Sequence, residues 1–142
     1  MAYLIDTDII IASLKANPIV NKRIAESLDI PKAISIITYG ELLFGAKKSS
    51  QREKNSALIY RLAEIFPIIG ISRAVIETFT DIKLYLERAG ERISDLDLLI
   101  ASTALSLNYV LVTNNVQLSA LHEGDIAPRI LSVSSRESCS IC

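Results

Sequence analysis

The sequence predicts an α/β protein built as a three-layer α/β/α sandwich, with helices on both faces of a mainly parallel central sheet. Short apolar runs alternate with longer segments of helical spacing, which is the pattern of strand–helix–strand units. Half of the 142 residues are apolar and 22% are charged, so the chain can bury a core. We expect a single domain over residues 1–142, with the tail beyond about residue 134 a candidate for disorder.

Each expected strand is a short apolar run that stops at a polar residue. The first stops at Asp6, the second at Thr38 and the fourth at Thr113. The third contains Pro67, which suits an edge strand because proline cannot donate to the ladder. The five expected strands are Tyr3–Ile5, Ala33–Ile37, Phe66–Ile71, Tyr109–Val112 and Ile130–Val133.

The expected helices carry capping residues at their starts. Asn17 and Pro18 provide an N-cap and a first-turn proline, and Ser72 caps a long helix that ends at Arg88. The helix Asp95–Leu107 is almost wholly apolar after its first turn and should be buried on most sides. The other helices are Ile19–Leu28, Tyr39–Lys47 and Arg52–Ile65.

Helical spacing also predicts which residues turn inward. In the helix over 52–65 they are Leu58, Leu62 and Ile65, with Ala57 beside them. In the helix after Ser72 they are Val75, Ile76, Phe79, Ile82 and Tyr85 or Leu86. Both helices carry many apolar residues for a small domain, so an exposed stripe can meet a second copy, and we expect a homodimer.

Net charge, apolar run length and cysteine placement exclude several classes of protein. The net charge of −1 gives no global sign of nucleic-acid binding, so an RNA site needs a local basic patch or bound cations. No apolar run is long enough for a membrane span, and the N-terminus does not read as a secretory signal. Cys139 and Cys142 fit a frayed tail better than half a zinc site, and His122 has no companion ligand. We expect a cytoplasmic protein that makes no membrane contact.

The informative residues are acids placed where strands end or helices begin. Asp6 closes the first strand, Glu41 follows the second, and Asp97 opens the buried helix. Asn114 and Asn115 follow the fourth strand. Because functional groups in parallel sheets gather at the carboxyl ends of the strands, these side chains can converge at one edge.

Each of these residues also has a purely structural interpretation. Thr38-x-x-Glu41 is a capping box, and Ser94-x-x-Asp97 is the same pattern with a shorter acid. Asp6 could cap the helix that follows it, and Asn114 could be a turn residue. Asp97 is hardest to explain as a cap alone, because a carboxylate in an apolar segment is costly unless it is paired or bound to a metal.

A carboxylate cluster cannot easily stay ionised without a cation, and ligands that are all oxygen favour Mg²⁺ or Mn²⁺. Such a site supports phosphodiester hydrolysis. The sequence lacks a G-x-S-x-G elbow, a glycine-rich phosphate loop, and a histidine beside a nucleophile. It therefore predicts metal-dependent phosphodiester chemistry.

Four segments resemble the motif blocks of PIN domains, and within these the VapC-type ribonuclease toxins: Leu4–Ile10, Ile34–Ala46, Ile93–Ala101 and Leu111–Asn115. The resemblance covers residues 3 to about 133. It implies a parallel sheet between helices and an Mg²⁺- or Mn²⁺-dependent endoribonuclease, often acting on transfer RNA. It also implies homodimers and a cognate antitoxin that binds on or near the active site. Carried over by position, Asp6, Glu41 and Asp97 match the acids that hold metal, and Asn115 matches a fourth catalytic position.

Three features depart from the family pattern. Asp8 stands where Asn is frequent and adds an acid, while Asp95 stands where Pro is common and should point to solvent. No further acid follows Asn115 in Val116–Leu118. The resemblance therefore implies one well-held metal, with any second ion recruited alongside RNA phosphate.

Other residues and functions remain open at this point. The basic residues Lys47, Lys48, Arg52 and Lys54 could follow the RNA backbone or form a solvated connection. Tyr39 and Phe44, on either side of Glu41, are interpreted first as packing residues. One alternative function is a catalytically inert PIN-like module that binds RNA or acts as a scaffold. A haloacid-dehalogenase-type phosphatase is less well supported, because Ile10 replaces an expected Thr or Val.

Overall fold

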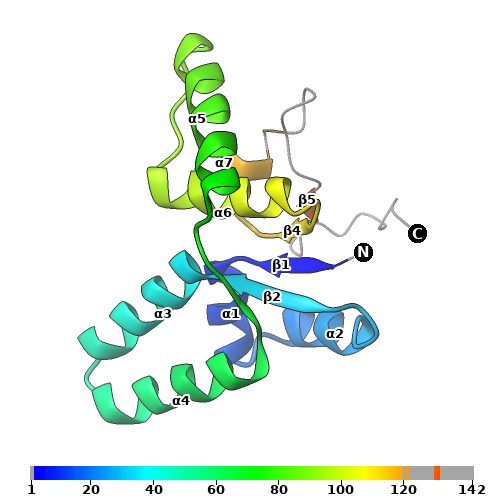
Figure 1. Cartoon of the computed structure of the whole chain (residues 1–142). Coiled ribbons are helices and arrows are strands. Elements are labelled where there is room, and N and C mark those ends of the chain that lie inside the picture. The colour runs from blue at the N-terminus through cyan, green and yellow to red at the C-terminus, as the bar shows by residue number, and fades with distance from the viewer. Residues whose placement is uncertain (1, 120, 122–129, 132–142) are drawn as a thin grey trace.

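The computed structural model describes residues 2–119, 121, 130 and 131, which include a five-stranded parallel sheet (Figure 1). The strands are β1 (Tyr3–Ile5), β2 (Lys32–Ser35), β3 (Ile68–Ile69), β4 (Val110–Val112) and β5 (Ile130–Leu131). They lie in the order β3-β2-β1-β4-β5, with every neighbouring pair parallel. After β1 the chain adds β2 and β3 on one side of it, and then adds β4 and β5 on the other side. This makes the boundary between β1 and β4 the switch point at which parallel sheets form sites.

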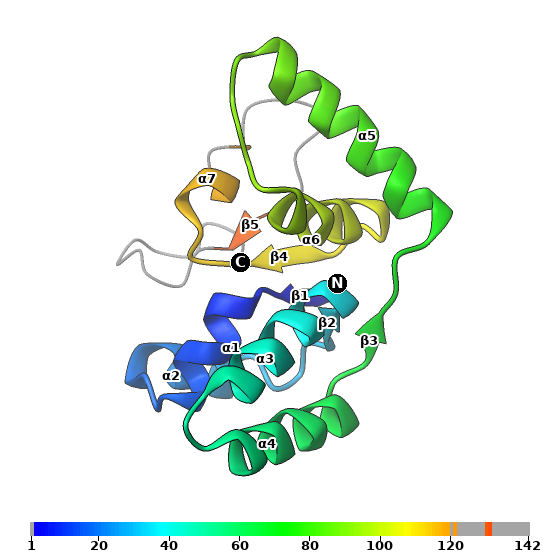
Figure 2. The same ribbon diagram turned by 90° about the vertical axis from the view of Figure 1, so that its left-hand side faces the viewer.

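Helices cover both faces of this sheet, which confirms the predicted three-layer architecture (Figure 2). One layer contains α1 (Thr7–Leu14), α2 (Pro18–Glu26), α3 (Ile36–Lys48) and α4 (Arg52–Ile65). The other contains α5 (Arg73–Arg88), α6 (Asp95–Ser106) and α7 (Val116–Ser119).

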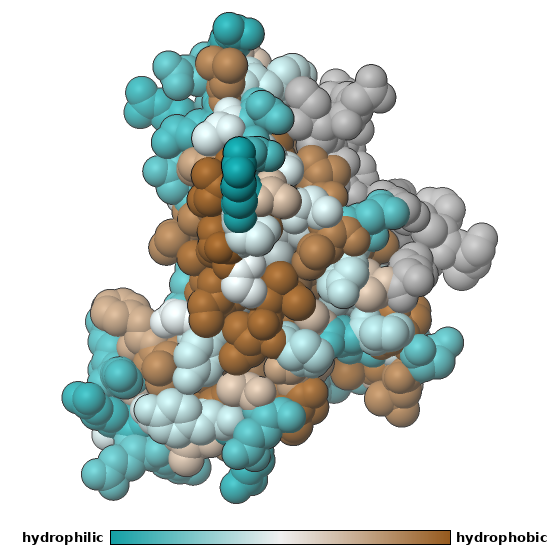
Figure 3. All heavy atoms as spheres, viewed as in Figure 1, coloured by the Kyte–Doolittle hydropathy of each residue, from teal (hydrophilic) through white to brown (hydrophobic). Residues whose placement is uncertain are grey.

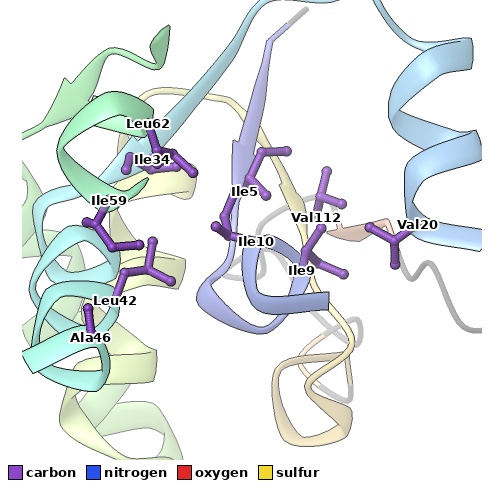
Figure 4. Packing of buried hydrophobic residues seen from close by; sticks show 10 residues of the cluster. All are labelled: Ile5, Ile9, Ile10, Val20, Ile34, Leu42, Ala46, Ile59, Leu62 and Val112. Carbon is purple, nitrogen blue, oxygen red and sulfur yellow. The ribbon is translucent and has the colours of Figure 1, made fainter. Parts of the chain in front are cut away.

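Alternation along the strands divides the core between the two faces. Ile5 and Val112 pack with residues of α1 to α4 in one cluster (Figure 4). Their strand neighbours Leu4 and Leu111 pack instead with α6 and α7. Successive strand residues point to opposite faces, so each face has its own apolar layer. The carboxyl ends of the strands lie outside both apolar layers, so polar side chains can be placed there.

Several elements match the sequence predictions closely. The strand Tyr3–Ile5 and the helix Arg52–Ile65 have the expected bounds. Asn17 and Ser72 are the N-caps of α2 and α5, as predicted. The helix α6 is buried on most sides, since Leu98 and the run 100–104 are nearly inaccessible to solvent.

The start of α3 differs from the prediction. The helix begins at Ile36, because the Ser35 hydroxyl accepts a hydrogen bond from the Ile37 amide and ends β2 early. Thr38 therefore lies inside the helix, and the predicted Thr38–Glu41 capping box is wrong. The third strand is also shorter than the predicted Phe66–Ile71.

The inward faces of two helices were predicted only in part. In α4 the buried residues are Ser56, Ile59 and Leu62, whereas Leu58 and Ile65 are 40% and 69% exposed. In α5 the buried residues are Val75, Ile82 and Leu86, with Ile76 and Tyr85 exposed. The helix α4 makes most of its contacts with α3, and α5 makes most of its contacts with α6, so part of each apolar surface remains exposed.

Within the described residues, no helix has both the length and the apolar character needed to cross a membrane. The predictions for His122, Cys139, Cys142, the end of the fifth strand and the tail fall outside the described residues.

Candidate active site

The predicted site residues lie at the carboxyl ends of β1, β2 and β4. Asp6 follows β1 as the N-cap of α1, and Glu41 lies in α3, which follows β2. Asp97 lies in the first turn of α6, and Asn115 lies between β4 and α7. The topological prediction that these segments meet at one edge is supported by the hydrogen bonds that join them.

Asp6 is both a helix cap and a buried carboxylate. It is 3% exposed, and its Oδ1 accepts from the Thr7 amide at 2.7 Å. Its second oxygen, Oδ2, accepts from the Thr113 hydroxyl at 2.7 Å. The capping role expected from sequence is real, but it uses only one of the two oxygens.

Glu41 is held by α1 rather than by its own helix. The Thr7 hydroxyl donates to Glu41 Oε1 at 2.9 Å and lies 3.2 Å from the Thr38 hydroxyl oxygen. Glu41 is half-buried, so its carboxylate remains within reach of a ligand. Thr7 therefore links the acid of α3 to the strand that carries Asp6.

Asp97 and Asn115 are in direct contact. Ser94 caps α6 by accepting from the Asp97 amide at 3.3 Å, as predicted. The Asp97 Oδ2 accepts from the Asn115 side-chain amide at 3.2 Å. The Asn115 Oδ1 accepts from the amides of Gln117 and Leu118, so the same side chain caps α7.

A continuous series of hydrogen bonds joins the four predicted residues. The Asn115 amide donates to Thr113 Oγ1 at 2.9 Å, and this hydroxyl donates to Asp6. The series runs through Glu41, Thr7, Asp6, Thr113, Asn115 and Asp97. Thr7 and Thr113 were not predicted as site residues. Their signal was a hydroxyl residue directly beside a strand-end acid or amide.

Asp8 also belongs to this edge. Its Oδ2 accepts from the Asn114 amide at 3.0 Å, while its Oδ1 is buried with no hydrogen-bond partner. Asp95 is different, because it is exposed and forms an ion pair with Lys83 at 2.9 Å. The expectation that Asp95 faces solvent is confirmed.

Burial and neighbouring charge raise the pKa of two acids at this edge, Asp6 and Asp8. Burial, reinforced by the charges of Asp8 and Asp97, raises the pKa of Asp6 to about 6 despite the hydrogen bonds from Thr113 and Thr7. Burial and the charge of Asp97 likewise raise the pKa of Asp8, against hydrogen bonds from the backbone amides of Asn114, Ile9 and Asp8 itself. Crowded carboxylates of this kind are stabilised in their ionised form by a cation.

The donor set fits a hydrated hard cation. Among the described residues, no three Asp, Glu, His or Cys side chains are already arranged around one point. Mg²⁺ requires no such cage, since it is usually held by one or two carboxylates and keeps several water ligands. The orphaned Asp8 oxygen and the crowded charges provide the oxygen ligands and the negative potential that such an ion needs.

Comparison with known proteins identifies the family of this chain. The family model described as PIN domain matches residues 3–123. The chain belongs to the PIN-domain family. It is 35% identical over 119 residues to Ribonuclease VapC1 of Haemophilus influenzae (strain R2866), covering 82% of this chain and 89% of that protein. It belongs with the VapC-type ribonucleases, the toxins of toxin–antitoxin pairs. This family assignment replaces the haloacid-dehalogenase alternative.

Two further comparisons bear on fold and substrate. The structure of VapBC-1 from nontypeable Haemophilus influenzae matches with a TM-score of 0.80 and 30% identity, over 95% of this chain and 100% of that one. The tRNA(fMet)-specific endonuclease VapC of Shigella flexneri is 28% identical over 120 residues, covering 82% of this chain and 89% of that protein. The PIN fold therefore spans nearly the whole chain, including all four predicted site residues.

Proposed function

We propose that this PIN domain is an Mg²⁺- or Mn²⁺-dependent endoribonuclease whose catalytic residues are Asp6, Glu41, Asp97 and Asn115. The observation that carries the proposal is the hydrogen-bonded series that joins these residues at the carboxyl edge of the sheet. Caps that served only their own helices would not require such links between elements far apart in sequence.

Asp6, Asp97 and Glu41 would hold the metal, which when bound supplies Lewis-acid stabilisation of phosphoryl charge and acidifies water at the site. The protein's own contribution is orientation. Thr113 fixes Asp6, and Thr7 fixes Glu41. Asn115 donates to Asp97 without adding a second negative charge at that point. Partners of this kind set the direction of a ligand oxygen before a metal arrives.

The substrate class follows from the relatives and from the surface. One relative is a tRNA(fMet)-specific endonuclease, and we propose transfer RNA as a substrate of this chain. The basic cluster whose role the sequence left open lies exposed around the connection between α3 and α4: Lys47, Lys48, Arg52 and Lys54. Phosphate contacts there would give binding a salt dependence. Because RNA is the substrate, we place the activity in the cytoplasm.

A groove of about 340 Å³ between α1, α3 and α4 is the proposed binding site of the cognate antitoxin. Ile11, Leu14 and Leu58 line it, and Glu41 lies at its border. An apolar segment with a basic side chain would fill the groove and neutralise Glu41, which would block metal and substrate together. The exposure of Leu58, unexpected from helical spacing, is explained by this groove.

We also propose a homodimer, formed through the apolar face that includes β3. Figure 3 shows hydrophobic residues gathered over the segment that joins α4 to α5 and over the start of α5. Ile65 at the end of α4 and Ile76 near the start of α5 are exposed, and β3 is an edge strand of the sheet. Light scattering should give twice the mass of one chain, and a monomer mass would contradict the proposal.

The test of function is cleavage of a mixed tRNA pool by purified protein with Mg²⁺, Mn²⁺ or EDTA, alongside Asp97→Asn. We expect discrete cuts with either metal, none with EDTA, and none from the folded variant. If both proteins are equally inert with every metal and neither binds Mn²⁺, the catalytic proposal fails. The inert RNA-binding module, which Asn115 favours by lacking a charge, would then be the better account.

A further inference from the structure

We propose that Asp8 is a fourth carboxylate of the metal site and supplies the negative charge that Asn115 does not. The inference rests on the proposed metal-dependent function and assigns a role to a residue outside the four catalytic positions. The first observation is the direction of the two carboxylates at the start of α1, Asp6 and Asp8. Asp6 reaches Thr113, and Asp8 reaches the adjacent residue Asn114, so both carboxylates are directed at the same turn after β4.

Only one of the two carboxylate oxygens of Asp8 has a hydrogen bond of good geometry. Its Oδ2 takes the Asn114 amide, while its Oδ1 is buried and lacks a hydrogen-bond partner. A buried carboxylate oxygen without a donor is costly, and such an atom calls for a bound water or ion. A divalent cation beside Asp6 and Asp97 would satisfy the oxygen and the crowded charge together.

The side-chain amide of Asn115 explains why a further acid would favour cation binding. Asn115 Nδ2 lies 3.2 Å from Asp97 Oδ2, so this side of the site presents a donor where a carboxylate would present charge. Asn115 Oδ1 is already engaged by the amides of Gln117 and Leu118. Asn115 therefore leaves the site one charge short, and Asp8 restores it from the first turn of α1.

The variant Asp8→Asn distinguishes the effect of the carboxylate charge from the effect of the hydrogen bond to Asn114. The amide oxygen can still accept from the Asn114 amide, so the link between α1 and the turn is kept while the charge is lost. Asp95→Asn is the matched control, because Asp95 lies two residues from Asp97 but is exposed and paired with Lys83. Each variant removes one negative charge.

The readout is Mn²⁺ binding to the purified full chain, measured by calorimetry and by electron paramagnetic resonance. We expect Asp8→Asn to weaken Mn²⁺ binding at least about tenfold, within the range seen when groups around a metal are removed, and Asp95→Asn to change it less than about twofold. Adding Asn115→Asp to Asp8→Asn should recover most of the loss, since an aspartate can still cap α7 while placing charge beside Asp97. Circular dichroism and thermal unfolding establish that each variant is folded.

Each outcome distinguishes this inference from the function on which it rests. If the wild-type chain binds Mn²⁺ and Asp8→Asn binds it equally well, Asp8 is only a link to the turn and the inference is wrong. If both single variants weaken binding alike, the effect is long-range charge and the inference is again wrong. If the wild-type chain takes up no Mn²⁺, the proposed metal chemistry fails as well.

Discussion

Asn17 and Asn115 are the same residue type in the same capping role, yet they lie in different environments. Asn17 caps α2 at the surface, and one oxygen, Oδ1, accepts from both Ile19 and Val20. Asn115 caps α7 through the same oxygen, but its amide nitrogen also reaches Asp97. The difference shows that a helix cap can also contact a carboxylate of another helix. What distinguishes a site residue is whether its second polar atom contacts another element.

Asp6 and Asp95 give the same lesson with carboxylates. Both lie at the start of a helix. Asp6 is buried, and its second oxygen accepts a hydrogen bond from Thr113, whereas Asp95 is exposed and paired with Lys83. If this distinction is correct, substitutions at residues that contact a second element should change cleavage, whereas substitutions at simple caps should not.

The largest effect is expected at Glu41. Glu41→Gln keeps an oxygen that can accept from the Thr7 hydroxyl but removes the charge. We expect metal-dependent cleavage to fall by about 10²–10³, the cost of losing one group that stabilises developing charge. Glu64→Gln, on the exposed side of α4, is the control and should cut at the wild-type rate. Equal rates for all three proteins would remove Glu41 from the site.

The second effect is on stability without metal. The pKa of Asp6 is raised from 3.8 to about 6, so its ionisation destabilises the folded state. That raised pKa contributes stability below about pH 4, and the contribution is lost as pH rises to about 6. The rise in pKa corresponds to about 3 kcal/mol in the free energy of unfolding.

Urea unfolding in EDTA from about pH 4 to pH 7 would measure this loss. Asp6→Asn removes the titrating group, so the difference between wild type and variant isolates the contribution of Asp6. A difference that does not change with pH would show that Asp6 is not held in a charge-disfavouring environment. Mn²⁺ should reduce the loss in the wild type, because the cation favours the ionised carboxylate.

A third, smaller effect is expected at Thr113. Thr113→Val keeps the shape but removes the hydroxyl that bridges Asp6 and the Asn115 amide. We expect cleavage to fall about 10–100-fold, as for other groups that orient metal ligands. A plot of rate against Mn²⁺ concentration should shift to higher metal. An unchanged midpoint would mean that the hydroxyl serves the fold alone.

The smallest effect compares the two asparagine caps directly. Asn17→Ala and Asn115→Ala should each cost about 1 kcal/mol in the free energy of unfolding, the usual cost of a lost N-cap. Only Asn115→Ala should also slow cleavage, because Asp97 then loses its donor. If the two variants behave alike in both assays, the contact with Asp97 has no catalytic role.

The sequence could predict the convergence of the acids because topology decides it. Once Asp6, Glu41 and Asp97 are placed after strands or at helix starts, a parallel sheet brings those segments to one edge. The same reasoning could not reveal the links through Thr7 and Thr113. Those bonds depend on side-chain directions that only the packed structure defines.

Two other errors arose where the sequence offered two equally good choices, for the N-cap of α3 and for the inward face of α4. Ser35 and Thr38 are both good caps three residues apart, and pattern alone favoured the pair Thr38–Glu41, whereas Ser35 begins α3. In α4, two apolar stripes share Leu62, and packing against α3 selects the one with Ile59. Phe44, interpreted as a packing residue, is 68% exposed, whereas Tyr39 packs against the core as expected.

The most direct test of the account is Asp6→Asn, measured for both stability and tRNA cleavage. We predict that the variant unfolds at an equal or higher temperature than wild type in EDTA at about pH 7, and cuts the tRNA pool about a hundredfold more slowly in Mg²⁺. Such a protein would have kept its helix cap and lost its metal ligand. A variant that cuts at the wild-type rate would contradict the central claim that the cap of α1 is also the carboxylate of the active site.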